Sequence, residues 1–298
     1  MDRVIVTGSS GFVGRALGAR LGRPFEALRF GAEGWREAIG RADFRSATVF
    51  HLAARVHRDE GGDGAAFQLD NVEKTRELAR AASAGGARRL VFLSTVKVHG
   101  EETAGRPFRA GDAPHPGDAY ARSKLAAEEA LAEIARRTGL EVATVRAPLV
   151  FGAGAKGNLA SLLRLADSAW PLPFASIANR RSFVHVDDLA RLLILCAESA
   201  AAANGTFLAA HAEPFSTPRL VAGLRASLGR APRLFAFPPA LLEAAAGLAG
   251  RGAAMRRLTR SLEVDAGDTT RALGWRADAG LDAAVADVVA GYRSRARS

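Results

Sequence analysis

Three glycines near the start of the chain restrict its fold more than any other feature. The stretch VTGSSGFVG places Gly8, Gly11 and Gly14 three residues apart, after the apolar residues 4–6 and before apolar residues at helical spacing. Glycines between a strand and a helix permit a tight turn, close approach of backbone N–H groups to a pyrophosphate, and close packing of helix on strand. The same glycines can serve packing alone, and their spacing is GxxGxxG rather than GxGxxG. The stretch predicts a strand–turn–helix unit that suits a dinucleotide.

The pattern of strand followed by helix continues along the first half of the chain. Apolar runs at residues 49–52, 90–93 and 142–145 predict strands, and helical periodicity at residues 72–84 and 121–137 predicts helices between them. Strands that alternate with helices favour a parallel sheet covered on both faces. The fold class is therefore expected to be α/β, a doubly wound Rossmann fold.

This regularity ends at Pro148, where segments rich in glycine and proline begin. A helix at residues 187–198 and a strand at 206–209 are expected to return to the sheet. The division that follows assigns residues 1–148 and 183–211 to the dinucleotide-binding core. Residues 149–182 and 212–298 are expected to form a smaller substrate-binding portion.

The second strand, expected around residues 25–30, ends at a basic residue. In dinucleotide-binding folds an acidic residue near this point receives the ribose hydroxyls. Arg29 would suit a 2′-phosphate and hence NADP, although a solvated surface arginine is an equally good interpretation. Some twenty residues then lead to the strand at residue 49, which is short for the usual helix, strand and helix. One sheet strand is therefore expected to be missing, leaving an open adenine pocket.

Composition narrows the partners and the compartment. The net charge is +10, but the arginines are scattered and no basic run alternates with aromatic residues, so a nucleic acid is not the expected partner. An anionic small substrate benefits equally from a positive field. Cys196 is the only cysteine, which excludes an internal disulfide and favours a reducing compartment, the cytoplasm.

No apolar stretch has the roughly 20 residues that a membrane-spanning helix needs. The first expected strand begins so early that no secretion signal is expected before it. The Ala-rich residues 238–249 favour a packed or dimer-forming helix, and weak peripheral membrane contact stays open for them. Stable membrane insertion is not expected.

A hydroxyl, a phenol and an amine form a candidate catalytic group. Tyr120 and Lys124 in YARSK lie four residues apart and so share a helix face, and Thr95 follows a strand, where ligands bind in parallel sheets. A free tyrosine has a pKa of about 10, and a nearby ammonium favours the phenolate that a general base needs. By itself YxxxK is also typical of an ordinary helix tyrosine followed by an exposed lysine.

Six motifs in order strengthen this interpretation: VTGSSGFVG, FHLAA, NVEKT, LSTVKVHG, YARSK and RSFVHVDDLA. They resemble the extended short-chain dehydrogenase/reductase superfamily, in its nucleotide-sugar epimerase/dehydratase group, over most of the chain. The resemblance implies an enzyme that uses NAD or NADP, a nucleotide-diphosphate sugar as substrate, and a homodimer formed through the helices that include Tyr120. It makes Tyr120 the acid/base, Thr95 the substrate-orienting hydroxyl and Lys124 the residue that holds the nicotinamide ribose and depresses the Tyr120 pKa.

The same resemblance implies the remaining binding residues. Gly8, Gly11, Phe12 and Val13 would line the pyrophosphate, and Asn71 would support the active site, while the adenosine side would be bordered by Leu52, Ala53 and Ala54. Asn158 in KGNLASLL would face the sugar nucleotide and Arg181 would clamp its diphosphate, which a guanidinium fork suits. A helix cap and a surface charge are the alternative interpretations of these two residues. Ser94 is expected to serve packing or local bonding.

Departures from the family pattern narrow the reaction. Nucleotide-sugar dehydratases carry an Asp-Glu pair directly after the active-site threonine, and this chain has Val96 and Lys97 there, so dehydration is not expected. Hydride transfer at the sugar C4 remains, as 4-epimerisation or 4-keto reduction. The wording of the motifs resembles UDP-N-acetylhexosamine 4-epimerases and N-acetyl-quinovosamine-type 4-ketoreductases, which serve bacterial surface polysaccharides. The sequence leaves these two reactions open.

Two other classes of protein share the fold. A non-catalytic NAD(P)-binding regulatory or assembly protein would usually lack the tyrosine or lysine, and the same objection applies to an RNA-binding relative. No metal is expected, because no HxH or cysteine cluster is present. His51 and His185 are expected to be structural.

Overall fold

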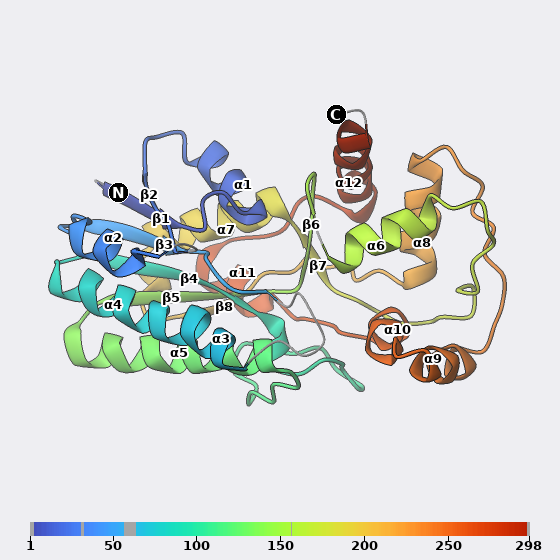
Figure 1. The fold of residues 1–298 in the computed structure, drawn as a ribbon, viewed down its shortest axis with the longest axis horizontal. Helices are drawn as coiled ribbons and strands as arrows, with labels where there is room; N and C mark the ends of the chain where they lie inside the picture. The colour runs from blue at the N-terminus through green and yellow to red at the C-terminus, as the bar shows by residue number, and fades with distance from the viewer. Residues whose placement is uncertain (1–2, 31–32, 57–63, 156, 297–298) are drawn as a thin grey trace.

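A parallel sheet of six strands forms one half of the molecule (Figure 1). The computed structural model describes residues 3–30, 33–56, 64–155 and 157–296. All pairings in this sheet are parallel, in the order β2-β1-β3-β4-β5-β8. The strands are β1 (Arg3–Thr7), β2 (Glu26–Leu28), β3 (Ala47–His51), β4 (Arg89–Thr95), β5 (Glu141–Ala147) and β8 (Thr206–Leu208). The expected doubly wound Rossmann fold is confirmed.

Helices cover both faces of this sheet, and successive residues of each strand therefore enter different cores. In β1, Val4 and Val6 pack in one cluster with Leu17 and Leu189, while Ile5 packs in the opposite cluster with Leu131. The first cluster lies under α1 (Phe12–Leu21) and α7 (Val186–Glu198). The second lies under α2 (Trp35–Arg41), α4 (Lys74–Ala84) and α5 (Ala119–Thr138).

The edge beyond β1 holds a single strand. β2 pairs with β1 from Ile5 opposite Glu26 to Thr7 opposite Leu28. In the described residues the chain passes from β2 to β3 through α2 alone, whereas the usual order 3-2-1-4-5-6 has two strands on this side. The expected loss of one strand agrees with this topology.

The other half of the molecule has its own hydrophobic cluster. Phe151, Leu163, Phe183, Leu224 and Val285 are among its fully or almost fully buried members. They come from a two-stranded sheet, β6 (Leu149–Phe151) and β7 (Phe183–His185), and from α6 (Asn158–Ala166), α8 (Thr217–Ser227) and α12 (Leu281–Ala296). A hairpin of α9 (Pro239–Leu248) and α10 (Gly252–Thr259) lies at the edge of this half, below α6 and α8 in Figure 1.

One C-terminal element packs on the sheet instead. The Trp275 side chain is 4% exposed and joins the cluster under α1 and α7. It follows α11 (Gly267–Leu273), whose Thr269 hydroxyl donates to the carbonyl of Leu208 in β8. The proposed substrate-binding portion thus includes a segment that completes the core of the sheet.

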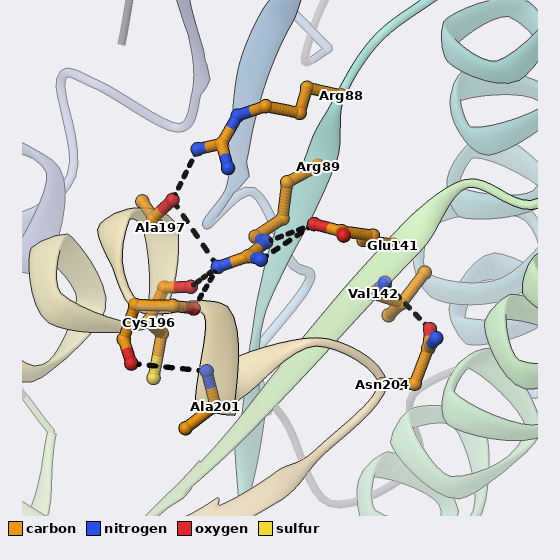
Figure 2. Close-up of polar contacts among 9 residues, drawn as sticks. Arg88, Arg89, Glu141, Val142, Cys196, Ala197, Ala201 and Asn204 are labelled. Carbon is orange, nitrogen blue, oxygen red and sulfur yellow. Dashed lines mark hydrogen bonds and ion pairs between the residues drawn. The ribbon is translucent and has the colours of Figure 1, made fainter.

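A buried arginine joins the amino ends of β4 and β5 to the end of α7 (Figure 2). Arg89 is 1% exposed and pairs with Glu141, with 2.6 Å between Nη2 and Oε2. Its Nη1 donates to the carbonyl of Cys196 at 2.8 Å and to that of Ser199. The positive guanidinium satisfies the free carbonyls at the negative end of the helix. These buried polar groups at the amino ends of β4 and β5 are therefore paired within the chain, whereas ligands of parallel sheets bind at the carboxyl ends of the strands.

Four short helical segments complete the description: α3 (Gly64–Phe67), the 3₁₀ turns η2 (Val96–Val98) and η3 (Ala200–Ala202), and a π-helical segment η1 (Gln68–Glu73). The segment η1 runs directly into α4, so the expected helix 72–84 begins earlier and with a wider turn. Among the described helices, none is both long enough and apolar enough to span a membrane.

Candidate active site

The glycine loop is so tightly packed that there is no room for side chains at two of its glycines. Gly8 has φ +70°, and a Cβ atom there would lie 2.7 Å from the backbone nitrogen of Ala53. The Gly11 N–H donates to the Gly8 carbonyl at 2.9 Å, and a Cβ on Gly14 would overlap that same carbonyl. Side chains at Gly8 and Gly14 would therefore force the loop apart. The result is a bare turn at the amino end of α1, where backbone N–H groups can receive a phosphate.

Phe12 and Val13 follow the loop on α1 and pack in different directions. Val13 packs in the core of the sheet, whereas Phe12 packs in the cluster of the other half. A Cβ on Gly152, which follows β6, would lie 3.1 Å from the Phe12 ring. Phe12 therefore joins the glycine loop to the substrate-side segment, and a role of these two residues in lining a pyrophosphate stays a prediction.

His51 is a structural link behind the loop. The Thr75 hydroxyl donates a hydrogen bond to the Asn71 carbonyl at 2.7 Å. Its oxygen therefore accepts the hydrogen bond from His51 Nε2, which lies 2.7 Å away. Nδ1 then accepts from the Thr7 hydroxyl at 2.6 Å, and Thr7 accepts from the Ala53 N–H. Burial, with the Lys124 ammonium nearby, lowers the pKa of His51 to about 3. The imidazole is neutral and carries its proton on Nε2.

Asn71 connects the loop after β3 to α5. Its Oδ1 accepts from the Arg55 N–H at 2.7 Å, and its Nδ2 donates to the Arg55 carbonyl and to the Ser123 hydroxyl at 2.9 Å. Ser123 donates to the Tyr120 carbonyl at 2.8 Å. The half-buried Leu52, Ala53 and Ala54 lie in the segment that Asn71 holds. Asn71 thus fixes the segment after β3 against the helix of Tyr120, and its role in supporting an active site stays a prediction.

Thr95 ends β4 at the carboxyl edge of the sheet. It is 8% exposed, and its hydroxyl accepts from the Lys97 N–H at 3.3 Å. Ser94 points elsewhere: its hydroxyl donates to the Glu128 carboxylate, which pairs with Arg146 at 2.6 Å in the interior. This pair fills the space behind β4, so Ser94 serves local bonding and Thr95 is the hydroxyl left at the edge.

The two residues that follow Thr95 are occupied structurally. Val96 is buried in a cluster with Leu208 and Leu262. The Lys97 ammonium pairs with Asp118 and, at 3.0 Å, with Glu101. Neither residue is a carboxylic acid, and that dehydration is absent stays a prediction from the sequence.

Asp118 holds the beginning of α5. Its Oδ1 accepts from the Ala121 N–H at 2.7 Å, which caps the helix, and its Oδ2 receives the Lys97 ammonium. Burial alone would raise the pKa of Asp118, but Lys97 and the Ala121 N–H hold it below its usual range. The pair fixes the first turn of α5, which carries Tyr120, against the turn that follows Thr95.

Tyr120 and Lys124 have strongly altered protonation. Burial, and secondly the Asp118 carboxylate, raises the pKa of Tyr120 to about 12. Burial lowers the pKa of Lys124 to about 7, against the opposing effect of Glu128. Within the described part of the chain the Lys124 ammonium has no hydrogen-bond partner and lies 3.9 Å from the centroid of the Phe92 ring. In this arrangement Lys124 does not produce the expected depression of the Tyr120 pKa.

On the substrate side, Arg181 is a half-buried arginine whose pKa is affected by the charge of Arg257 in α10. Arg181 forms bridges with Phe215 and Leu262, and its Nη1 donates to the Arg260 carbonyl at 2.9 Å. Burial and the neighbouring Arg257 lower the pKa of Arg181 to about 10. No described carboxylate pairs with either group, whereas Arg180 is already paired with Glu263. A guanidinium without a carboxylate partner suits an anion, so the contact of Arg181 with a diphosphate stays a prediction.

Two further expected residues are placed by their elements. Arg29 follows β2 at the carboxyl edge and is exposed, without a described carboxylate partner. Asn158 begins α6, as expected of a residue at a helix start, but its side chain lies outside the described part of the structure.

Comparison with known proteins now assigns the chain. The model of the NAD dependent epimerase/dehydratase family matches residues 33–210. The chain belongs to the NAD-dependent epimerase/dehydratase family. It is thus an enzyme of the short-chain dehydrogenase/reductase type that uses NAD or NADP, and the resemblance found in the sequence motifs is confirmed.

Individual proteins and structures match this chain over most of its length. It is 33% identical over 297 residues to UDP-glucose 4-epimerase of Vibrio cholerae, covering 92% of this chain and 90% of that one. It is 25% identical to the N-acetyl-alpha-D-glucosaminyl-diphospho-ditrans,octacis-undecaprenol 4-epimerase of Escherichia coli O157:H7, covering 77% and 73%. The structure of RMD from Pseudomonas aeruginosa complexed with NADPH has a TM-score of 0.80 at 22% identity, covering 99% and 100%. This last likeness shows the shared fold.

The residues at the carboxyl edge fit the cofactor of the family. The bare glycine turn offers backbone N–H groups to a pyrophosphate. Among the described residues the buried Lys124 ammonium has no anionic or carbonyl partner, and ribose hydroxyls can take that role. Sequence motifs located these groups, but they missed Arg257. In the sequence Arg257 is only one more basic residue. It comes near Arg181 because the chain just after α10 forms a bridge to Arg181 at Leu262.

Proposed function

We propose that this enzyme interconverts the C4 configuration of a UDP-N-acetylhexosamine for the synthesis of a bacterial surface polysaccharide. The observation that carries the proposal is Arg181, a half-buried arginine that has no carboxylate partner among the described residues and whose guanidinium suits a diphosphate. Arg181 bridges Leu262, which packs with Val96, the residue after Thr95. The anion site is thereby connected to the candidate catalytic edge. Two relatives named as 4-epimerases support C4 as the reacting carbon.

The chain's own groups account for the proton transfer. Thr95 orients the C4 oxygen, and Tyr120 removes its proton as a phenolate or returns it as a phenol. Lys124 would hold the ribose of the cofactor. A bound nicotinamide supplies the chemistry of taking up and returning the C4 hydride. Arg181 holds the diphosphate while the sugar turns.

A second candidate, NADPH-dependent reduction of a 4-keto sugar, is favoured by two observations. Arg29 at the end of β2 suits the 2′-phosphate of NADP. Tyr120, with its pKa raised to about 12, is a phenol at neutral pH and so is ready to donate a proton to a ketone oxygen. Both reactions use the same three residues.

One assay separates the two reactions. The purified protein is mixed with UDP-N-acetylglucosamine alone, and separately with UDP-4-keto-6-deoxy-N-acetylhexosamine and NADH or NADPH. Formation of the C4 epimer without added reductant supports the epimerase. Oxidation of NADPH that requires the keto sugar supports the reductase. The absence of turnover on either nucleotide sugar, with cofactor bound, would contradict both and favour a non-catalytic NAD(P)-binding protein.

We further infer a homodimer formed through α4 and α5 and a cytoplasmic reaction. α4 and α5 pack side by side on one face of the sheet, and α5 carries Tyr120. Light scattering of the purified protein tests the dimer, with a monomer mass contradicting it.

A further inference from the structure

Helix α9 presents an apolar surface that nothing in the described chain covers. Leu241 is 56% exposed and Leu248 is 94% exposed, and Ala244 and Ala245 between them are exposed as well. Positions 241, 244, 245 and 248 share one face of a helix. None of the ten residues of α9 is buried. A leucine as fully exposed as Leu248 is uncommon where it has no partner.

The only charged residue of α9 is turned away from this surface. Glu243 accepts from the Thr259 hydroxyl at 2.6 Å and pairs with Arg260 at 2.7 Å, and both residues lie at the end of α10. The contact with α10 therefore uses the polar face of α9. The apolar face is left pointing away from its partner helix.

Basic residues gather at the turn of the hairpin. Arg251 and Arg256 are exposed, and neither has a carboxylate partner among the described residues. The Arg251 N–H donates to the Ala246 carbonyl at 2.7 Å, which places Arg251 next to Leu248 at the end of α9. A Cβ on Gly252 would lie 3.4 Å from Nη1 of Arg256, so that guanidinium folds back over the same turn. Apolar and cationic groups thus share the tip of the hairpin.

We propose that the α9–α10 hairpin docks on the surface of an anionic lipid bilayer. Apolar side chains on one face of a helix with arginines beside it are what an interfacial helix requires, since the leucines enter the headgroup boundary and the arginines bind lipid phosphates. A second copy of the chain fits this face less well. A two-fold interface would bring Arg251 and Arg256 near their own copies, and like charges would meet there, since Glu243, the carboxylate on which Arg256 acts, already pairs with Arg260.

The position of the hairpin allows this contact. In Figure 1, α9 and α10 lie at the margin of the molecule, away from the sheet and from α5, where the dimer is expected. α10 also carries Arg257, whose charge acts on Arg181. Docking therefore leaves the carboxyl edge of the sheet free and rests on no assumption about the reaction.

Sedimentation with lipid vesicles tests the docking. The full chain is mixed with vesicles of phosphatidylglycerol and phosphatidylethanolamine, or of phosphatidylcholine alone. Binding is expected to the anionic vesicles and to be lost in high salt. Leu248→Glu should weaken it about tenfold, because the side chain is too exposed to matter for folding and loses its apolar burial in the membrane. The double variant Arg251→Glu, Arg256→Glu should weaken it by at least about tenfold.

Matched controls carry the same chemical change elsewhere. Leu165→Glu changes another exposed leucine, on α6, and Arg20→Glu reverses an exposed charge on α1. Both should bind as the unchanged protein does. Equal loss of binding in the controls, or no binding of the unchanged protein to anionic vesicles, would overturn the proposal. So would a dimer in light scattering that Leu248→Glu dissociates, because the face would then be covered by a second copy.

Discussion

At the scale of single residues, charges next to Tyr120 set how readily it gives up its proton. Asp118 contributes to the raised pKa of Tyr120 and is itself held by Lys97. Asn at position 118 keeps a helix cap but removes the carboxylate. Asp118→Asn should therefore lower the pKa of Tyr120 from about 12 towards its usual range, although burial keeps it raised.

Absorbance of the tyrosinate during a pH titration measures this change. Tyr292 is the only other tyrosine, so a Tyr292→Phe background leaves a single reporter. Lys97→Met is the matched control, since it leaves the Asp118 charge without its partner and should not lower the Tyr120 pKa. An unchanged titration in Asp118→Asn would show that this carboxylate does not act on Tyr120.

Arg257 provides a second prediction at this scale. Arg257→Gln should raise the KM for a UDP-sugar about ten- to a hundredfold, because a charge-assisted contact to the diphosphate is lost. The affinity for NAD(P)H, measured by fluorescence titration, should not change. Arg219→Gln, an exposed arginine on α8, is the control. Equal KM values for the two variants would contradict a diphosphate at Arg181 and Arg257.

Some of these residues could be predicted from the sequence, and others could not. Thr95, Tyr120 and Lys124 could be found because a strand end and an i, i+4 spacing are local features. The structural role of His51 was also predictable, although its partners Thr7 and Thr75 were not. Arg257 and Asp118 act through contacts between segments distant in the chain, and no local pattern encodes these.

At the scale of elements, the end of α7 depends on one buried side chain. Arg89→Met leaves the Cys196 and Ser199 carbonyls without their donor and Glu141 without its partner (Figure 2). We expect a loss of about 3 kcal/mol in the free energy of unfolding. Urea denaturation measures it. Arg88→Met, an exposed neighbour that makes one bond to the Ala197 carbonyl, should cost much less. Similar costs for both variants would contradict the role of Arg89.

Strands and helices of the Rossmann core could be placed from apolar periodicity, within a few residues. The π-helical segment Gln68–Glu73 could not, because its sequence has no distinct period. Its wide turn presents Asn71 to Arg55 and Ser123, so a contact between segments determines its shape. The missing strand was predictable from chain length alone, since some twenty residues cannot hold two helices and a strand.

At the scale of the whole molecule, two buried basic groups make stability depend on pH. His51 has its pKa lowered from 6.5 to about 3, so the unfolded chain binds a proton in this range that the folded chain does not. Stability should therefore fall as the pH drops from 6.5 towards 3. Lys124 has its pKa lowered from 10.5 to about 7, so by the same reasoning stability should rise with pH across that interval.

Urea midpoints of the cofactor-free protein across these ranges test both effects. Lys124→Met removes the buried ammonium and should flatten the rise above pH 7. A urea midpoint that decreases from neutral to alkaline pH in the unchanged protein would contradict a lowered pKa of Lys124 in the folded state.

The division into two portions was visible in the sequence only as the loss of regularity after Pro148. Trp275 and α11 pack on the sheet although they follow the substrate-side segments, and composition does not reveal this return. The sequence also could not show that one face of α9 is exposed, because an apolar helix has the same sequence pattern whether it is covered or not.

The central claim is that Tyr120 transfers the proton of a C4 hydroxyl on a nucleotide sugar. The most direct measurement compares kcat of Tyr120→Phe with that of Tyr292→Phe on the substrate identified by the assay, with NAD(P)H affinity measured in parallel. Tyr292 only donates to Asp167 on the substrate side, so it is the matched control. We expect kcat to fall at least about a hundredfold in Tyr120→Phe with cofactor affinity unchanged, and not to fall in Tyr292→Phe. Full activity of Tyr120→Phe would contradict the central claim.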